Sequence, residues 1–242
     1  MVQDRRFNTV VLHFIICAWY VFTVAQNMAI TSLRSHPGVS AFGGRWKYLT
    51  FINLVLQAVF FSICFLADIG QLWDKVKEKQ SLSTLVSFRD GLFSVLAFPV
   101  GTFVVISFWA LYTYDRELVF PKHLDAIIPT WLNHAMHTFI LPLLLVELYA
   151  VRHQYPKKKH GLLGLAVFCI LYLVWVFYIK YAADIWVYPV LAQLSHVGMV
   201  VFFSLSFLIF AYLYFLGEML SMRFWGKSEH SRKKAEHSRR RD

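Results

Sequence analysis

Residues Tyr48–Ala67 read YLTFINLVLQAVFFSICFLA, a run of twenty residues that contains no acidic or basic side chain. A helix rises about 1.5 Å per residue, so a run of this length spans about 30 Å, the thickness of a bilayer hydrocarbon core. A segment inside lipid must satisfy its own backbone hydrogen bonds, and a helix does so. The run therefore predicts a membrane-spanning helix.

The rest of the chain repeats this pattern. Only 16% of its 242 residues are charged and 58% are hydrophobic, whereas a soluble domain carries about 25% charged residues. This composition excludes soluble, disordered and fibrous proteins and favours one polytopic membrane domain. We expect an all-α protein with six membrane-spanning helices, because six apolar segments are long enough. They are Thr9–Ala29, Tyr48–Ala67, Gly91–Tyr112, Ile127–Leu148, Leu162–Ile179 and Leu191–Leu216.

The basic residues are divided unevenly between the loops that six spans create. The side that carries both termini holds 18 Lys and Arg residues, and the opposite side holds 6. Cytosolic loops are enriched in these residues, so we expect both termini in the cytosol. We expect residues 1–222 to form the membrane domain and residues 223–242 a basic, disordered cytosolic tail. The net charge of +10 follows from this arrangement, and we expect no nucleic-acid partner.

Polar side chains on the second segment share one face of the predicted helix. At about 100° per residue, all of them fall within an arc of about 60°, and the opposite face is Leu, Val and Phe. We expect this stripe to face the interior of the bundle. Interhelical hydrogen bonding and a polar functional site both account for it. The stripe consists of Thr50, Asn53, Gln57, Cys64 and Asp68.

The fourth segment contains two histidines in the sequence PTWLNHAMHTF. Thr130, Asn133, His134 and His137 share one helical face at spacings of three, four and seven residues. A histidine at such a position acts as a general base, a proton relay, a metal ligand or a hydrogen-bonded core residue. The common serine-hydrolase, zinc-protease and nucleotide-binding motifs are absent from the sequence. A threonine hydroxyl activated by histidine is chemically reasonable.

Two further functions fit these polar clusters. A zinc-dependent lipid hydrolase could use His134, His137 and His196 together with a carboxylate such as Asp184. A lipid transporter or scaffold could use the same polar cavity, because prolines inside the third and fourth segments can break helices.

Five segments carry a family resemblance. They are FGGRWKYLTFINLVLQAVFF from Phe42, SFRDGLFSVLAFPVGTFV from Ser87, YDRELVFPKHLDAIIPTWLNHAMHTF from Tyr114, HQYP from His153 and WVYP from Trp186. In this order they resemble the family of androgen-induced gene products and androgen-dependent TFPI-regulating proteins, over roughly residues 18–217. The sequence PTWLNHAMHTF and the basic tail resemble the second of these two groups, the androgen-dependent TFPI-regulating proteins, more closely.

The resemblance implies a six-span hydrolase of fatty acid esters of hydroxy fatty acids that uses a threonine nucleophile and a histidine. The family's threonine falls on Thr50 and its histidine on His137. We expect the lipid substrate to enter from the bilayer, with no metal and no cofactor. Side chains expected to support the reaction are Asn53, Gln57, Asn133 and His134. Cations available to a substrate carboxylate are Arg45, Lys47, Arg116 and Lys180. The plasma membrane and the endoplasmic reticulum both fit, and the oligomeric state stays open.

Overall fold

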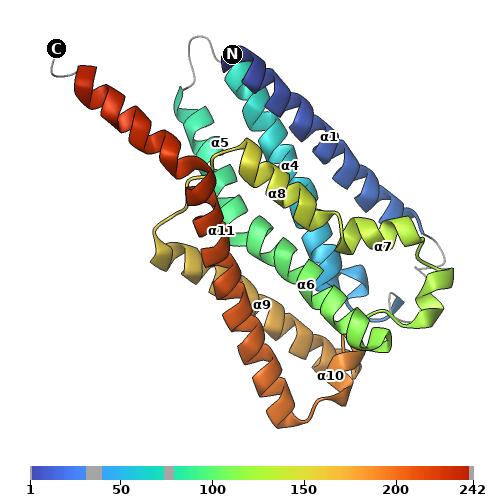
Figure 1. Ribbon diagram of the computed structural model, residues 1–242. Coiled ribbons are helices and arrows are strands. Elements are labelled where there is room, and N and C mark those ends of the chain that lie inside the picture. The colour runs from blue at the N-terminus through green and yellow to red at the C-terminus, as the bar shows by residue number, and fades with distance from the viewer. Residues whose placement is uncertain (1, 31–39, 74–78, 240–242) are drawn as a thin grey trace.

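The computed structural model describes residues 2–30, 40–73 and 79–239, and every regular element in these ranges is a helix (Figure 1). The predicted all-α class is confirmed. The α-helices are α1 (Val2–Ala29), α4 (Leu49–Trp73), α5 (Lys79–Leu92), α6 (Phe98–Asp115), α7 (Thr130–His137), α8 (Ile140–Ala150), α9 (Lys158–Ala183), α10 (Pro189–Gln193) and α11 (His196–Arg239). Short helical turns are η1 (Gly44–Lys47), η2 (Phe93–Ala97), η3 (Arg116–Leu118) and η4 (Lys122–Ala126).

Five helical segments in the described ranges are long and apolar enough to cross a membrane. Each coincides with one predicted span, and the third is formed jointly by α5, η2 and α6. The chain is therefore a multi-pass membrane protein. The segments are Phe7–Ala29, Leu49–Leu72, Leu82–Leu118, Lys158–Ala183 and His196–Gly226.

The remaining predicted span, Ile127–Leu148, is not one continuous helix, and the sequence-based expectation was wrong on this point. The backbone N–H groups of Thr138 and Phe139 both donate to the carbonyl of His134, at 2.8 and 3.0 Å, and α7 ends there. Pro142 lacks the N–H that would bond the carbonyl of Thr138, and its ring crowds that carbonyl. The proline thus accounts for a break four residues before it.

The C-terminal segment also differs from expectation. Residues 223–242 were expected to be a disordered tail, but α11 continues through Arg239. The segment contains eight Lys and Arg residues and two Glu residues, all with high helix propensity, and it contains no proline. In Figure 1, α1 begins and α11 ends at the same end of the bundle.

The polar face of α4 is turned into the bundle, as its spacing predicted. Asn53, Gln57 and Cys64 are fully buried, whereas Val59 and Leu66 on the opposite face are about half exposed at 47% and 57%. A surface of Val and Leu suits contact with lipid, and the buried polar face suits contact with other helices. The candidate functional side chains therefore lie along the inside of α4.

A π-helical turn, η2, precedes α6 and shapes the wall opposite α4. It ends two residues before Pro99, whose missing N–H disrupts the regular hydrogen-bond ladder. Gln57 Nε2 donates to the carbonyl of Ala97 at 3.0 Å. A Cβ atom added at Gly101 would come within 2.8 Å of Gln57 Nε2. The glycine therefore allows α6 to approach α4 closely at this level.

Candidate active site

Thr50 and His137 lie beside each other in the fold although 87 residues separate them in the sequence. Thr50 lies in the first turn of α4, and His137 is the last residue of α7. The Nε2 atom of His137 is 3.3 Å from Oγ1 of Thr50. A hydroxyl at this distance can pass its proton to an imidazole lone pair, which is the geometry of an activated nucleophile.

Asn133 determines which nitrogen of His137 carries the proton. Nδ1 of His137 lies 2.8 Å from Oδ1 and 3.0 Å from the backbone oxygen of Asn133. The backbone oxygen only accepts hydrogen bonds, so Nδ1–H must donate to it. In a neutral imidazole this leaves Nε2 with a free lone pair, directed at Thr50.

Two side chains of helix α6 hold His137 in position. The Phe108 ring stacks on the His137 ring with centroids 3.6 Å apart and planes 11° apart. Trp109 Nε1 donates to the backbone carbonyl of His137 at 2.9 Å. This carbonyl lies at the end of α7, where helix carbonyls lack partners within the helix, so Trp109 satisfies it. These contacts fix both the ring and the backbone of His137.

His134 has different surroundings from His137. Its Nδ1 lies 2.9 Å from Oγ1 of Thr138, and its ring stacks on Trp109 with centroids 5.7 Å apart. The contact with Thr138 closes the turn at which α7 ends. His134 therefore packs at the helix break, while the contact with Thr50 belongs to His137.

Asn53 and Gln57 lie on the same face of α4 as Thr50 and form one polar unit. Gln57 Nε2 donates to Oδ1 of Asn53 at 3.0 Å. Nδ2 of Asn53 and Oε1 of Gln57 are buried and have no hydrogen-bond partner among the described residues. The Asn53 amide thus retains an unused donor one turn below Thr50.

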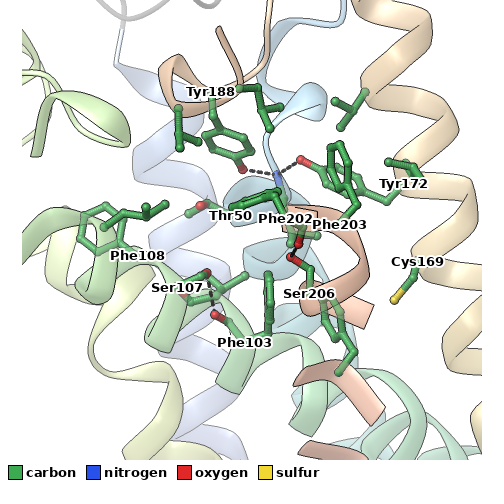
Figure 2. A pocket seen from close by; sticks show the side chains of 18 of the residues that line it. Thr50, Phe103, Ser107, Phe108, Cys169, Tyr172, Tyr188, Phe202, Phe203 and Ser206 are labelled. Carbon is green, nitrogen blue, oxygen red and sulfur yellow. Dashed lines mark hydrogen bonds between the residues drawn. The ribbon is translucent and has the colours of Figure 1, made fainter. Parts of the chain in front are cut away.

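Tyr172 and Tyr188 form a pair of hydroxyl groups at the start of α4. Both accept from the backbone N–H of Leu49, at 3.0 Å for Tyr172 and 2.9 Å for Tyr188, as Figure 2 shows. Tyr172 donates its own proton to the carbonyl of Lys47 at 3.0 Å. The side chains of Tyr188 and Thr50 also line the same cavity. Burial raises the pKa of Tyr188, so its hydroxyl keeps its proton and can donate it.

Sequence reasoning missed Tyr188 as a site residue. It lies in the segment between α9 and α10, where no helical periodicity marks an inward face. The WVYP segment that contains it contributed only to the family resemblance. Its place beside Thr50 arises from tertiary structure.

A largely apolar cavity adjoins Thr50. It lies between α6, α9 and α11, and Phe103, Phe203 and Phe210 are among its walls (Figure 2). Thr50 and Tyr188 supply polar atoms to its lining, whereas His137 is behind the lining residue Phe108. The Thr50 hydroxyl therefore lies beside an apolar cavity.

Three of the four cations expected to meet a substrate carboxylate already have partners. These pairs are Arg116 Nη2 with Asp125 Oδ1 at 2.7 Å, Lys180 with Asp184, and Arg45 Nη2 with the carbonyl of Ile30 at 3.2 Å.

The fourth cation, Lys47, differs from the other three because it is buried without such a partner among the described residues. Its side chain is 1% exposed, and its Nζ has no hydrogen-bond partner among the described residues. The ammonium lies 5.4 Å from the centre of the Tyr48 ring. Burial lowers the pKa of Lys47, because the charged form loses its hydration. A carboxylate would compensate for this loss.

The zinc site considered for a metal-dependent hydrolase does not assemble. In the part of the chain that the structure describes, one group of three or more His, Cys, Asp or Glu side chains is close enough to hold a metal ion. That group is His13, Cys64 and Glu147. It includes none of the expected ligands, which were His134, His137, His196 and Asp184.

The sequence profile of the FAR-17a/AIG1-like proteins matches residues 8–222. The human androgen-dependent TFPI-regulating protein is 43% identical over 227 residues, which cover 94% of this chain and 97% of that protein. The human androgen-induced gene 1 protein is 44% identical over 193 residues, with coverages of 78% and 81%. No solved structure matches the chain.

A distant relative extends this similarity. A membrane protein of Schizosaccharomyces pombe is 24% identical over 214 residues, which cover 86% of this chain and 87% of that protein. The profile match runs from α1 into α11, and Thr50, Asn133, His137 and Tyr188 all lie inside it. This multi-pass membrane protein, with its threonine and histidine in contact beside an apolar cavity, therefore belongs to the FAR-17a/AIG1-like family.

Proposed function

We propose that the chain is an intramembrane lipid ester hydrolase that cleaves fatty acid esters of hydroxy fatty acids, with Thr50 as nucleophile and His137 as base. The observation that carries this proposal is the hydrogen-bonded order Thr50, His137, Asn133. The distances are 3.3 Å from Thr50 Oγ1 to Nε2 and 2.8 Å from Nδ1 to Asn133 Oδ1. Nucleophile, base and orienting group in this order are the parts of a covalent hydrolase.

In the first half-reaction, Nε2 of His137 takes the proton of Thr50 while Oγ1 bonds to the ester carbonyl carbon. The carbonyl electron pair moves onto oxygen, and the Tyr188 hydroxyl at the same end of the cavity is available to donate to this oxyanion. The tetrahedral intermediate then breaks the bond to the alcohol oxygen. Nε2–H of His137 protonates this oxygen, so the hydroxy fatty acid leaves and an acyl ester remains on Thr50.

In the second half-reaction, water replaces the departed alcohol. His137 removes a proton from the water, whose oxygen attacks the acyl carbon. The bond to Thr50 Oγ1 breaks, the hydroxyl recovers its proton from His137, and a free fatty acid leaves. The side chains that contact the reacting atoms thus return to their starting protonation state, and no cofactor is consumed.

The surroundings of Thr50 suit a long lipid with one charged end. The aromatic walls of this cavity suit an acyl chain, which gains about 25 cal/mol for each Å² of apolar surface removed from water. Lys47, three residues before Thr50, offers a buried ammonium without a hydrogen-bond partner. We assign the free carboxylate of the substrate to Lys47, because the other three cations are already paired.

We also propose that α7 and α8 together make a sixth, broken crossing of the membrane. The shared end of α1 and α11 in Figure 1 supports an even number of crossings. The excess of Lys and Arg on that side supports a cytosolic location for both termini. Under this topology, Thr50 lies in the outer half of the membrane domain, near the start of the second crossing.

Turnover by the purified protein tests the proposal. The full chain in detergent is incubated with a palmitoyl ester of hydroxystearic acid, and free hydroxystearate is measured by mass spectrometry. We expect turnover by the wild type, none by Thr50→Ala, and partial activity in Thr50→Ser, which keeps a hydroxyl. A folded, pure wild-type protein without turnover would support a transporter or scaffold instead.

Covalent labelling tests the nucleophile separately. A fluorophosphonate probe should add one adduct to the intact mass, and peptide mapping should place it on Thr50. Thr113, whose hydroxyl bonds backbone carbonyls on α6, provides a control substitution that should leave labelling unchanged. Labelling that persists in a folded Thr50→Ala variant would exclude Thr50 as the nucleophile.

A further inference from the structure

A second polar cluster lies at the other end of the inward face of α4. Cys64 is 14 residues beyond Thr50, or about 21 Å along the helix, so this cluster is separate from the candidate active site. Its side chains come from α1, α4, α5, α8 and the segment after α8, and each is at most 8% exposed. They are His13, Cys64, Asp68, Arg89, Asp90, Glu147 and His153.

Glu147 lies at the centre of this cluster, between two histidines. Its Oε2 is 2.7 Å from Nε2 of His13, and its Oε1 is 2.9 Å from Nε2 of His153. The other nitrogen of each ring faces an aspartate: Asp68 lies 2.8 Å from Nδ1 of His13, and Asp90 lies 3.0 Å from Nδ1 of His153. In each imidazole, Nδ1 thus faces an aspartate carboxylate, and Nε2 faces the carboxylate of Glu147 that both rings share.

This pattern resembles the surroundings of metal-bound histidines. In such sites one ring nitrogen binds the metal, and the other donates its proton to a carboxylate that fixes the ring. Asp68 provides this carboxylate for His13. The Cys64 sulfur, a soft metal ligand, lies 3.8 Å from Oε1 of Glu147.

The charge of the cluster requires additional cations. With neutral imidazoles, the three carboxylates exceed the single guanidinium of Arg89 by two negative charges, and Glu147 is fully buried. Uncompensated charge in a dry interior is costly. Neutrality requires either two further protons, one on each imidazole, or one divalent cation.

We propose that His13 Nε2, Cys64 Sγ and a carboxylate oxygen of Glu147 bind a divalent transition metal of the zinc class. These ligand atoms lie within 4.8 Å of one another, and nitrogen, sulfur and oxygen donors together suit zinc. A zinc ion has ligand distances of about 2.0–2.3 Å, so a tetrahedral site separates N and O ligands by about 3.3 Å. The Glu147 carboxylate, now 2.7 Å from His13 Nε2, must therefore move away by about 0.6 Å. A water molecule supplies the fourth ligand.

Binding balances in protons and charge. The metal displaces one proton from imidazolium His13 and one from the Cys64 thiol, and both protons are released to solvent. The thiolate and three carboxylates then carry four negative charges. The metal, Arg89 and doubly protonated His153 carry four positive charges. His153 stays outside the coordination sphere and holds Glu147 in place through Nε2–H.

Metal content tests the proposal directly. The full chain is purified in mild detergent without chelators, supplied with zinc chloride, freed of excess metal and analysed by inductively coupled plasma mass spectrometry. We expect about one zinc per wild-type chain and less than a tenth of this in His13→Gln and Cys64→Ala. Cys169→Ala, another buried cysteine in a different apolar cluster, should retain zinc. Folded wild-type protein without zinc would overturn the proposal and leave a purely protonated cluster.

Cobalt provides a second readout that does not depend on hydrolysis. A Co²⁺ ion bound by a thiolate gives a sulfur-to-metal charge-transfer absorption band. We expect this band in the wild type and in Thr50→Ala, and we expect its loss in Cys64→Ser, the mildest change of the ligand. A band that persists in folded Cys64→Ser would exclude Cys64 as a ligand. Because Thr50→Ala should bind metal but lack turnover, this proposal and the proposed hydrolase can fail independently.

Discussion

The Asn133 side chain accepts a hydrogen bond from Nδ1 of His137 at 2.8 Å, one helical turn away on α7. An amide therefore holds the imidazole where many hydrolases use a carboxylate. The amide carries no charge to stabilise an imidazolium, and the backbone oxygen of Asn133, which only accepts hydrogen bonds, fixes the tautomer. This arrangement brings together Asn133 and His137 on the last turn of α7 and Thr50 at the start of α4.

Replacing Asn133 should slow turnover without removing it. In Asn133→Leu the backbone carbonyl of residue 133 still accepts from Nδ1, so only part of the orientation is lost. We expect kcat to fall by about 10- to 100-fold, less than the full contribution of about 10²- to 10⁴-fold from a general base. Asn133→Asp keeps an acceptor and should lose less. Equal kcat for folded Asn133→Leu and wild type would contradict the assignment.

Tyr188 should contribute to stabilising the transition state. Tyr188→Phe removes the hydroxyl near Thr50, and loss of one oxyanion donor typically lowers kcat by about 10²- to 10³-fold. Tyr172→Phe is a matched control, because both hydroxyls accept from the same Leu49 N–H. Steady-state kinetics of the two variants should show the larger loss for Tyr188→Phe. The opposite order would assign the donor to Tyr172.

Substitutions of the two histidines of α7 should differ in their effects on turnover and on the detergent melting temperature. His137→Ala should abolish turnover while leaving the folded fraction close to wild type, because it removes the base in contact with Thr50. His134→Ala should retain measurable activity and lower the detergent melting temperature, because it removes the contact with Thr138. Turnover and melting are measured side by side. An active His137→Ala with an inactive, folded His134→Ala would reverse the assignment.

Lys47 should govern the preference for a free carboxylate. We expect Lys47→Met to raise KM for the free acid by about 10- to 100-fold, as for loss of a charged hydrogen bond. The methyl ester of the same substrate should be unaffected. Arg116→Met, which removes a cation already paired with Asp125, is the control.

The same residue predicts a pH effect. Burial lowers the pKa of Lys47 from its ordinary 10.5, and the ammonium exists below the folded pKa and disappears above it. The preference for free acid over methyl ester should therefore decline as pH rises through this lowered pKa. A preference that is constant across the alkaline range, or that survives Lys47→Met, would assign the carboxylate to another cation.

The sequence predicted the inward face of α4 because its polar residues follow helical periodicity, and periodicity survives folding. It did not predict the break after α7. Pro142 can break a helix, but the residue at which α7 ends depends on the carbonyl of His134, which accepts from two backbone N–H groups. The contact between Thr50 and His137 joins residues far apart in the chain. Only the family resemblance paired them beforehand.

The surroundings of Glu147 likewise could not be predicted from the sequence. At the end of an apolar run, a glutamate commonly extends toward the membrane surface. The structure buries Glu147 completely, because His13 and His153 meet it from different parts of the chain. Such contacts compensate a buried charge with residues that are far apart in the sequence. No local sequence pattern shows that these residues meet. Sequence periodicity therefore found the helix faces but not their partners.

The contact between His13 and Glu147 also affects how the protein is made. The two residues are 134 positions apart, and a ribosome adds about 5–20 residues per second, so roughly 7 to 27 s pass between their syntheses. During this interval the first helix of the nascent chain carries a histidine whose final partner does not yet exist. Translation that stops before Glu147 leaves Nε2 of His13 without its carboxylate, although Asp68 can already contact Nδ1. Truncated products should therefore be recognised as unfinished and degraded, even when every helix they contain has been inserted.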